Sequence, residues 1–370
     1  MGLEDRRYLD IWTAKKLGIW EAEDLTREDI DSYTVKKLKE TVEYAAANSS
    51  FYRELLSGHM ERVSDDGGES CRAYGDILPW KKGGMSDAEF VELFRKLPFT
   101  YPEDLRKRGL EFLCVGPGEI SRIVTLDTGG STGKPKRIYF TEEDQQLTVD
   151  YFQNGMRLIV NKDDKVLILM PARVPGSIGL LLGKALENLG IETVRYGLPG
   201  GSREEMRDIL QLMEDEKVTS AVALPTHMRM LAEMASEKKL QLGSVLLSAE
   251  YVDEADVRLI GDAFGCRVYE HYGMTEMGLG CAVSCGCGDG YHIRELDLYI
   301  EIIDPGTGEV IEDERPGEVV FTTLTRKGMP FVRYRTGDCS HWINEPCGCG
   351  SVLRRIAKVG RRSEMKGYLR

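Results

Sequence analysis

The sequence lacks a long apolar run, and that absence excludes a membrane-spanning helix. No stretch approaches the roughly 20 consecutive apolar residues that a helix needs to cross a bilayer, although 42% of the 370 residues are hydrophobic. The first residues, Met1 to Arg6, are followed by charged sequence where a secretory signal would have a compact apolar stretch, and Arg6 occupies the position at which a myristoylation motif needs Ser or Thr. We therefore expect a soluble, cytoplasmic protein without a membrane partner.

Basic residues are in the minority. The chain has 49 lysines and arginines against 61 aspartates and glutamates, which gives a formal net charge of -12. Such a surface repels polyanions, so nucleic acid is not an expected partner. Internal repeats and low-complexity tracts are missing as well. A chain of this length exceeds what one core usually supports, so we expect one large domain with subdomains or two closely packed domains.

The nine cysteines are an odd number, which argues against a disulfide framework in an intracellular chain. Seven of them lie between Cys266 and Cys349. There, 285–288 reads Cys-Gly-Cys-Gly and precedes His292, and 347–350 repeats Cys-Gly-Cys-Gly. Cysteines separated by glycine can converge on a tetrahedral metal ion without crowding. Free or redox-active thiols stay open as the alternative, because Cys-x-Cys is a looser signal than paired Cys-x-x-Cys.

Apolar periodicity predicts the secondary structure. Residues 1–110 have the pattern of helices, and within 34–47 the apolar side chains of Val35 and Leu38 share one face. From about Lys165, short apolar runs alternate with amphipathic stretches, which predicts parallel strands with helices packed on the sheet. The expected strands are 166–170, 193–196, 220–224, 245–247 and 267–269, and the expected helices are 178–189, 204–213, 227–235 and 254–264.

The period shortens to two after about Tyr291. Residues 298–303 and 318–323 alternate in this way, and the turn-rich segment 304–308 follows the first of them, which predicts antiparallel strands. The expected fold class is therefore α/β. It has a large N-terminal domain of layered, parallel-rich sheets and helices, and a small antiparallel β subdomain.

Residues 128–136 have the composition of a polyphosphate-binding loop. Three glycines let the backbone approach a ligand closely, three hydroxyl side chains can donate hydrogen bonds, and two lysines add positive charge. The loop is not a Walker A motif, because Pro135 stands where Ser or Thr would follow Gly-Lys. A P-loop NTPase is therefore disfavoured, and a Gly/Ser-rich surface turn is the plain alternative.

This loop resembles the phosphate-binding loop of the acyl-adenylate-forming superfamily, and three further motifs follow in the family's order. Residues 272–276 resemble a Tyr-Gly-x-Thr-Glu motif, so the resemblance implies that Thr275 contacts the α-phosphate and that Glu276 helps to hold magnesium. Residues 334–338 resemble Tyr-x-Thr-Gly-Asp, whose Asp receives the ribose hydroxyls. Residues 360–364 resemble a Gly-Arg-x-Asp-Asp hinge, with Ser and Glu replacing the Asp pair.

Residues 248–250 also resemble a short segment that lines the adenine pocket. Residues 48–53 and 97–100 look like the phenylacetate-CoA ligase branch, which includes the coenzyme F390 synthetase-like proteins. By this resemblance Thr275 and Glu276 are the catalytic residues. The residues expected to bind the nucleotide are Thr128, Gly129, Gly130, Ser131, Thr132, Gly133, Lys136, Ser248, Ala249, Glu250, Glu270, His271, Tyr272, Asp338 and Arg361.

The same branch often has a Cys before Tyr-His and a later Pro-Cys-x-Cys-Gly. The resemblance thus implies a closed structural zinc site, with Cys287 as the main rival of the histidine. The implied zinc ligands are Cys285, His292, Cys347 and Cys349. On this basis we divide the chain into a helical part at 1–110, a nucleotide- and acid-binding α/β body at 111–290, and a β-rich subdomain with the candidate zinc site at 291–362.

The resemblance implies an AMP-forming carboxylic acid ligase. The carboxylate attacks the α-phosphorus of Mg-ATP, pyrophosphate leaves, and an acceptor thiol, coenzyme A by the same resemblance, displaces AMP. An aryl or aryl-acetic acid would suit apolar walls from Val174, Ile178 and Met274. The expected ligands and cofactors are the small-molecule acid, ATP or AMP, Mg²⁺, CoA and a structural Zn²⁺, and a homodimer stays open.

The superfamily's small C-terminal domain, which carries a catalytic lysine, would begin near Glu364, whereas the sequence ends at Arg370. We expect 363–370 to be a remnant of the hinge and the small domain to be absent, so that a separate chain supplies it or accepts the acyl group. Two alternatives stay open. One is a non-catalytic nucleotide-binding or assembly subunit, and the other is an acyl-protein synthetase that acylates a protein cysteine.

Overall fold

The computed structural model describes residues 7–63, 78–82, 84–126, 135–235 and 240–361. The chain divides into two compact units, each assembled from separate stretches of sequence. Unit 1 comprises Met1–Leu25, Gln145–Arg294 and Ile343–Gly360, and unit 2 comprises Thr26–Asp144, Glu295–Trp342 and Arg361–Arg370. Among the described residues, no helix combines the length and the apolar character needed to cross a membrane. The division at residues 110, 290 and 362 stays a prediction.

Unit 1 is built on a nine-stranded sheet with the strand order β13-β14-β9-β8-β7-β6-β5-β3-β4. The pairs from β7 to β4 are parallel, and the pairs from β7 to β14 are antiparallel. The parallel strands predicted by the apolar runs are thus confirmed. The strands are β3 (Lys165–Leu169), β4 (Glu192–Arg195), β5 (Ser220–Ala223), β6 (Ser244–Leu247), β7 (Arg267–Tyr272), β8 (Ala282–Val283), β9 (Tyr291–Ile293), β13 (Trp342–Ile343) and β14 (Arg355–Ile356).

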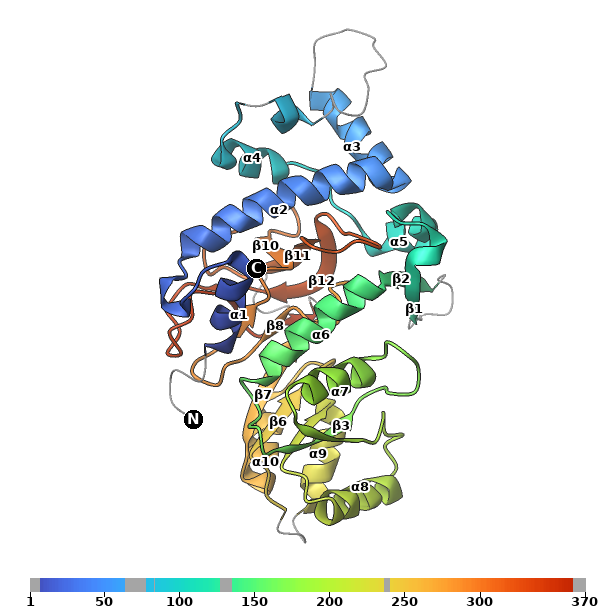
Figure 1. The fold of residues 1–370 in the computed structure, drawn as a ribbon, viewed down its shortest axis with the longest axis vertical. Helices are drawn as coiled ribbons and strands as arrows, with labels where there is room; N and C mark the ends of the chain where they lie inside the picture. Colours follow the sequence, from blue (N-terminus) through green and yellow to red (C-terminus); the bar gives the residue numbers. More distant parts are fainter. Residues whose placement is uncertain (1–6, 64–77, 83, 127–134, 236–239, 362–370) are drawn as a thin grey trace. The chain divides into compact units, whose positions relative to one another are not determined.

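Helices cover both faces of the parallel strands. Successive strand residues point to opposite faces. Leu167 and Val245 belong to a core cluster with α8, α9 and α10, whereas Val222 and Leu246 face a cavity lined by α6 and α7. Figure 1 shows β3, β6 and β7 with these helices beside them. The helices are α6 (Glu142–Met156), α7 (Ile178–Asn188), α8 (Arg203–Asp215), α9 (Pro225–Met234) and α10 (Glu254–Phe264); unit 1 also holds α1 (Tyr8–Leu17) and the 3₁₀ turn Ala22–Asp24.

Local sequence explains where these helices begin and end. In α8 the buried residues Met206, Ile209 and Met213 recur at helical spacing, and Ser202 caps the N-terminus by accepting a hydrogen bond from the Glu205 amide. The helix α10 ends at Gly265, whose φ of 60° places it in the left-handed conformation that glycine adopts without steric cost. Each helix is thus defined by its own residues and buries one apolar face.

Unit 2 contains a four-stranded sheet of order β10-β11-β12-β15 and the antiparallel pair β1-β2. The predicted antiparallel strands at 298–303 and 318–323 are confirmed, because Leu298 pairs with Thr323 and Ile303 with Glu318. The strands are β1 (Ile120–Leu126), β2 (Lys136–Thr141), β10 (Leu298–Ile303), β11 (Gly317–Thr323), β12 (Tyr334–Ser340) and β15 (Gly360–Arg361).

The helical part of unit 2 comes from the N-terminal third of the sequence. Its helices are α2 (Arg27–Asn48), α3 (Ser50–Val63), α4 (Asp87–Phe94) and α5 (Pro102–Arg108), with 3₁₀ turns at Pro79–Lys82, Gly109–Phe112 and Pro117–Glu119. The helix predicted at 34–47 lies within α2, which begins earlier, at Arg27. Thr26 and Asp29 form a capping box there, in which the Asp29 carboxylate accepts from the Thr26 amide at 2.9 Å.

Candidate functional site

Two of the predicted ligand-binding segments meet at one edge of the unit 1 sheet. Residues 248–250 directly follow β6, and residues 273–276 directly follow β7. The two strands are parallel neighbours, with Leu247 opposite Glu270. Their carboxyl ends therefore lie at the same edge, which is where open α/β sheets bind ligands. The structure brings these two segments together within unit 1.

The turn after β6 is held in a strained conformation. Ala249 has a φ of 72°, which is unusual for a residue with a side chain and costs on the order of 1–3 kcal/mol. Its neighbours fix it, because the Ser248 amide donates to the Ala223 carbonyl at 3.1 Å and the Glu250 carboxylate accepts from the Thr226 hydroxyl at 2.6 Å. Ala249 and Glu250 are themselves exposed. A rigid, exposed backbone turn of this kind suits the edge of a ligand pocket.

The turn after β7 carries the two residues predicted to be catalytic. The Gly278 amide donates to the Thr275 carbonyl at 3.0 Å, and Glu276 is only 1% exposed while Thr275 remains partly exposed. Only glycine fits at Gly273, because a Cβ there would lie 2.9 Å from the Cα of Gly280. The turn is thus compact, with one partly exposed threonine and one buried glutamate.

Glu270 occupies the end of β7, just ahead of that turn. Its carboxylate accepts a hydrogen bond from the Tyr291 hydroxyl at 2.8 Å and forms an ion pair with Lys358 at 3.2 Å. Burial, followed by the Glu270 charge, raises the pKa of Tyr291 well above its ordinary value, so the phenol stays protonated and donates. The Glu270 side chain is therefore engaged within unit 1.

A cavity lies between the sheet and the helices α6 and α7, directly behind these turns. It encloses about 430 Å³ of space between atoms, the solvent opening included, of which about 30 Å³ admits the centre of a water molecule. It is therefore narrow. The lining residues are Tyr151, Phe152, Gly155, Met156, Ile159, Met170, Ile178, Leu182, Val222, Leu246, Ser248, His271 and Val283.

The sequence-based choice of pocket walls was partly wrong. Ile178 lines the cavity, whereas Val174 is 49% exposed and neither it nor Met274 is a lining residue. Sequence reasoning missed the contribution of α6, from which Tyr151, Phe152 and Gly155 come. The sequence does contain a signal for this lining face of α6, because Tyr151, Gly155 and Ile159 follow one another at four-residue spacing, as residues on one helix face do.

Ser248 and His271 are two polar residues of the cavity wall that contact each other. The Ser248 hydroxyl lies 2.8 Å from Nδ1 of His271. Burial, with a further contribution from the positive charge of Arg294, lowers the pKa of His271 to about 4, so the imidazole is neutral near pH 7. Its other nitrogen, Nε2, is buried and has no hydrogen-bond partner among the described residues.

In unit 2, Asp338 projects from an interruption of the β11–β12 ladder. Val320 pairs with Arg335 but Glu318 pairs with Cys339, so β12 has two more residues than β11 between these pairs. The interruption is fixed by the Thr336 hydroxyl, which donates to the Val319 carbonyl at 2.7 Å and accepts from the Asp338 amide at 3.0 Å. Bulges of this kind re-aim side chains next to binding sites.

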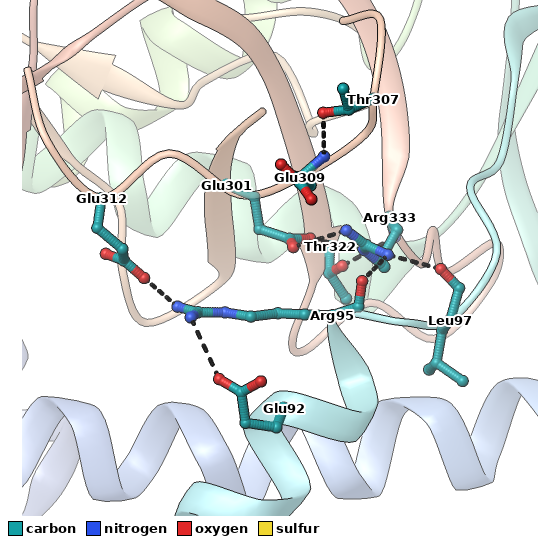
Figure 2. A network of polar contacts seen from close by, with 9 residues as sticks. All are labelled: Glu92, Arg95, Leu97, Glu301, Thr307, Glu309, Glu312, Thr322 and Arg333. Carbon is teal, nitrogen blue, oxygen red and sulfur yellow. Dashed lines mark hydrogen bonds and ion pairs between the residues drawn. The ribbon is translucent and has the colours of Figure 1, made fainter. Parts of the chain in front are cut away.

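A buried arginine anchors the start of this strand (Figure 2). Arg333 is 1% exposed with a φ of 47°, and its Nε and Nη2 donate to the Glu301 carboxylate at 3.1 and 3.0 Å. Its Nη1 donates to the carbonyls of Arg95 and Leu97, and its amide donates to the Thr322 hydroxyl at 2.9 Å. Through its side chain and its amide, Arg333 thus ties the start of β12 to β10, to β11 and to the segment after α4. Arg333 was not among the residues predicted from the sequence to be functional.

Four predicted zinc ligands lie together in unit 1. The ligand atoms of Cys285, His292, Cys347 and Cys349 are buried and lie within 4.8 Å of one another. Cys285 Sγ lies 3.5 Å from Cys347 Sγ, and Cys349 Sγ lies 3.3 Å from His292 Nε2. A tetrahedral zinc ion bound at about 2.1–2.3 Å separates its ligand atoms by about 3.5–3.8 Å, so the cluster fits such an ion.

Cys287, the rival of His292, is not part of this set. It is only partly buried, and its amide donates to the Cys285 sulfur at 3.4 Å. Asp10 lies near the cluster, because its carboxyl interacts electrostatically with His292. Burial raises the pKa of this carboxyl, and the charge of His292 acts in the opposite direction. Nδ1 of His292 and Oδ2 of Asp10 are both buried without a hydrogen-bond partner among the described residues.

The remaining predicted nucleotide residues are divided between the two units. Tyr272 belongs to unit 1, whereas Lys136 at the start of β2 and Arg361 at the end of β15 belong to unit 2. The loop residues 128–133 and the hinge remnant 363–370 lie outside the described residues. The convergence of all these segments on one nucleotide stays a prediction.

Known proteins resemble this chain over nearly its whole length. A phenylacetate-coenzyme A ligase from Thermus thermophilus is 28% identical over 355 residues, which is 93% of this chain and 73% of that protein. A protein of the same name from Pseudomonas putida is 29% identical over 344 residues, or 90% of this chain and 70% of that protein. The chain thus spans about seven tenths of these relatives' length.

Solved structures share the fold. Two structures of a 2-hydroxyisobutyryl-CoA ligase, each in complex with 2-HIB-AMP and CoA, superpose with TM-scores of 0.74 and 0.72 at 21% sequence identity. They cover 91% of this chain, and the chain covers 69% and 71% of theirs. The predicted α/β fold class is thereby confirmed. Residues 123–324, more than half of the chain, match the family of AMP-binding enzymes, and the chain belongs to that family.

Proposed function

We propose that this protein is an AMP-forming carboxylic acid ligase of the phenylacetate-CoA ligase kind. It activates an aryl or other small organic acid with ATP to an acyl-adenylate and transfers the acyl group to coenzyme A. The observation that carries this proposal is the apolar cavity, which lies beside Ser248 and His271 at the carboxyl ends of β6 and β7. Family membership and relatives named phenylacetate-coenzyme A ligase support it.

The size and lining of the cavity favour a small acid. Its wall is almost entirely apolar, and its narrow interior suits an aryl or short acyl group better than a long chain. Of the predicted walls, only Ile178 contributes. An acid seated there would direct its carboxylate toward the Thr275 turn, because both lie at the carboxyl ends of the same parallel strands.

In the first half-reaction, a carboxylate oxygen of the acid bonds to the α-phosphorus of ATP, and the bond from that phosphorus to pyrophosphate breaks. Thr275 donates a hydrogen bond to the α-phosphate, and the exposed turn at 248–250 lines the adenine. Asp338 accepts from the ribose hydroxyls, with Arg361 nearby, and 128–136 holds the β- and γ-phosphates. Positioning and charge compensation supply most of the acceleration in such a reaction.

Glu276 is the proposed magnesium ligand. Glu276 is 1% exposed and directly follows Thr275, so a phosphate brought to Thr275 would need a cation between it and the carboxylate. The cation would neutralise charge on the phosphates during displacement. In the second half-reaction, the CoA thiol attacks the acyl carbon and AMP leaves.

A structural zinc ion is proposed at Cys285, His292, Cys347 and Cys349. The four buried ligand atoms fit a closed tetrahedral site, and such sites serve folding. Asp10 would orient the imidazole through Nδ1, as carboxylates commonly do for zinc-bound histidines. No described residue favours a non-catalytic subunit or an acyl-protein synthetase over the ligase.

Exchange of radiolabelled pyrophosphate into ATP, measured over a panel of acids, tests the ligase directly. Acid-dependent exchange is expected from the protein. Glu276→Gln should lower the exchange rate by about 100-fold or more, because removing charge compensation of the transition state typically has effects of that size. The control Glu233→Gln alters a carboxylate that is 59% exposed on α9 and should exchange like the wild type. Wild-type exchange in Glu276→Gln would contradict the magnesium assignment.

A further inference from the structure

One nitrogen in the cavity wall, Nε2 of His271, has no hydrogen-bond partner among the described residues. Apart from Ser248, His271 and the phenol of Tyr151, the lining side chains have no oxygen or nitrogen. Nδ1 of His271 faces the Ser248 hydroxyl at 2.8 Å, but Nε2 is buried without a partner among the described residues. Leaving a buried polar atom unpaired destabilises the folded protein, so this arrangement requires an explanation.

The space beside Nε2 is kept free by a glycine. A Cβ at Gly280 would lie 3.2 Å from Nε2 and 2.5 Å from the ring of Tyr151, so a larger residue would crowd both side chains. Ser248 meanwhile fixes the imidazole from its other side. The ring is therefore held in one orientation, with Nδ1 toward Ser248 and Nε2 on the side of Gly280.

We propose that Nε2 of His271 determines the acid specificity of this enzyme by hydrogen-bonding a hydroxyl group on the acyl part of the substrate. The substrate class is a small carboxylic acid that is mostly apolar and carries one neutral hydroxyl. This inference rests on the ligase function proposed above. It assigns His271 to the acid, in addition to its sequence-based assignment to the nucleotide.

The Ser248–His271 pair is suited to a hydroxyl in particular. A neutral imidazole has one donor and one acceptor nitrogen, and the serine hydroxyl can satisfy either one. Nε2 can therefore accept from the substrate hydroxyl or donate to it, according to which tautomer the serine stabilises. A charged substituent would find no counter-ion in the lining, so it should be rejected.

Matched acid pairs test the proposal. The probes are phenylacetate, 3-phenylpropionate and benzoate, each compared with its ring-hydroxylated analogues in the pyrophosphate exchange assay. The protein should favour the hydroxylated member of at least one pair by about tenfold or more in kcat/KM, since a site built to bond a hydroxyl discriminates against its absence. The preference should lie in the KM for the acid, with the KM for ATP unchanged between members of a pair.

Two substitutions at His271 separate its two nitrogens. His271→Asn retains an amide at the position of Nδ1, which can still contact Ser248, but it removes Nε2. It should reduce the preference to within about twofold, while His271→Gln, whose amide reaches the position of Nε2, should retain part of it. Ile178→Val serves as the matched control, because it trims an apolar wall and should change the rates for both members of a pair alike.

The outcomes distinguish the inference from the function on which it rests. Exchange with equal kcat/KM for both members of every pair, or a preference that survives in His271→Asn, would overturn the role of His271 and leave the ligase in place. Absence of exchange with every acid would refute the ligase, and the inference with it. A preference lost in His271→Asn and partly kept in His271→Gln is the supporting result.

Discussion

At the scale of single residues, burial decides which chemical form a side chain takes. His271 stays neutral because its ring is desolvated in an apolar wall and because the Arg294 charge opposes protonation. In the unfolded chain the same histidine would titrate near its ordinary pKa of about 6.5. The protein therefore gains stability from His271 only where the imidazole is unprotonated.

This difference predicts a pH dependence of stability. The pKa in the folded protein, about 4, lies below the unfolded value, so the unfolded state binds more protons between about pH 6.5 and 4. The contribution is fully present above pH 6.5 and is lost as the pH falls toward 4, by at most about 3 kcal/mol.

Urea unfolding of the wild type and of His271→Asn at several pH values would measure it, because asparagine does not titrate and the other groups cancel in the difference. As the pH falls, the free energy of unfolding of the wild type should decrease relative to that of His271→Asn. A difference that stays constant from pH 7 to 4 would contradict the neutral, buried imidazole.

At the scale of elements, the strand that carries Asp338 depends on a buried ion pair. Arg333 and Glu301 have side-chain exposures of 2% and 0%, and Figure 2 shows that the guanidinium also reaches the chain after α4. The bulge at 336–338 interrupts the ladder hydrogen bonds of β12. The Arg333 contacts fix the start of the same strand, ahead of the bulge that carries Asp338.

Removal of one partner of the Arg333–Glu301 ion pair should destabilise the folded protein. Glu301→Ala leaves a buried guanidinium without its counter-ion, and we expect it to lower the free energy of unfolding by about 3–5 kcal/mol. The exposed pair Arg315–Asp313 offers a matched control, because Asp313→Ala should change stability by less than about 1 kcal/mol. Urea denaturation of both variants measures the contrast, and similar small losses for both would argue against an anchoring role for Arg333.

At the scale of the whole molecule, distant stretches of sequence cooperate within each unit. Unit 1 includes 343–360, which returns to the sheet formed by 145–294 through β14 and the cysteine cluster. Cys285 and Cys347 are far apart in sequence, and an ion held by both would close a long loop. Such a closure stabilises the folded state against an unfolded chain that lacks it.

The proposed zinc ion therefore makes a prediction about folding. The purified protein should contain about one equivalent of zinc by elemental analysis, and Cys347→Ser should lose that zinc and lower the unfolding temperature. The control Cys114→Ser alters a cysteine in unit 2, outside the cluster, and should retain the metal. Zinc content at or near zero in wild-type protein purified without chelators would refute the assignment.

The element types could be predicted because their signals are local. Strand β10 and helix α10 have the bounds that the apolar pattern predicts. The residues that cap α10, Asp253 at its start and Gly265 at its end, directly flank the helix in sequence. The spacing of Cys285, His292, Cys347 and Cys349 marked a candidate metal set, and these side chains do lie together. Their occupation by zinc stays a prediction.

The amino-acid sequence by itself determined the periodicity of the strands and helices, the caps, and the motifs that carry the chemistry, because each of these depends on residues only a few positions apart. Only the tertiary structure decided that α6 lines the cavity, that Ser248 leaves Nε2 of His271 unpaired, and that Arg333 anchors the strand of Asp338. These contacts join residues that are far apart in the chain, and their energies depend on burial, which no local pattern specifies.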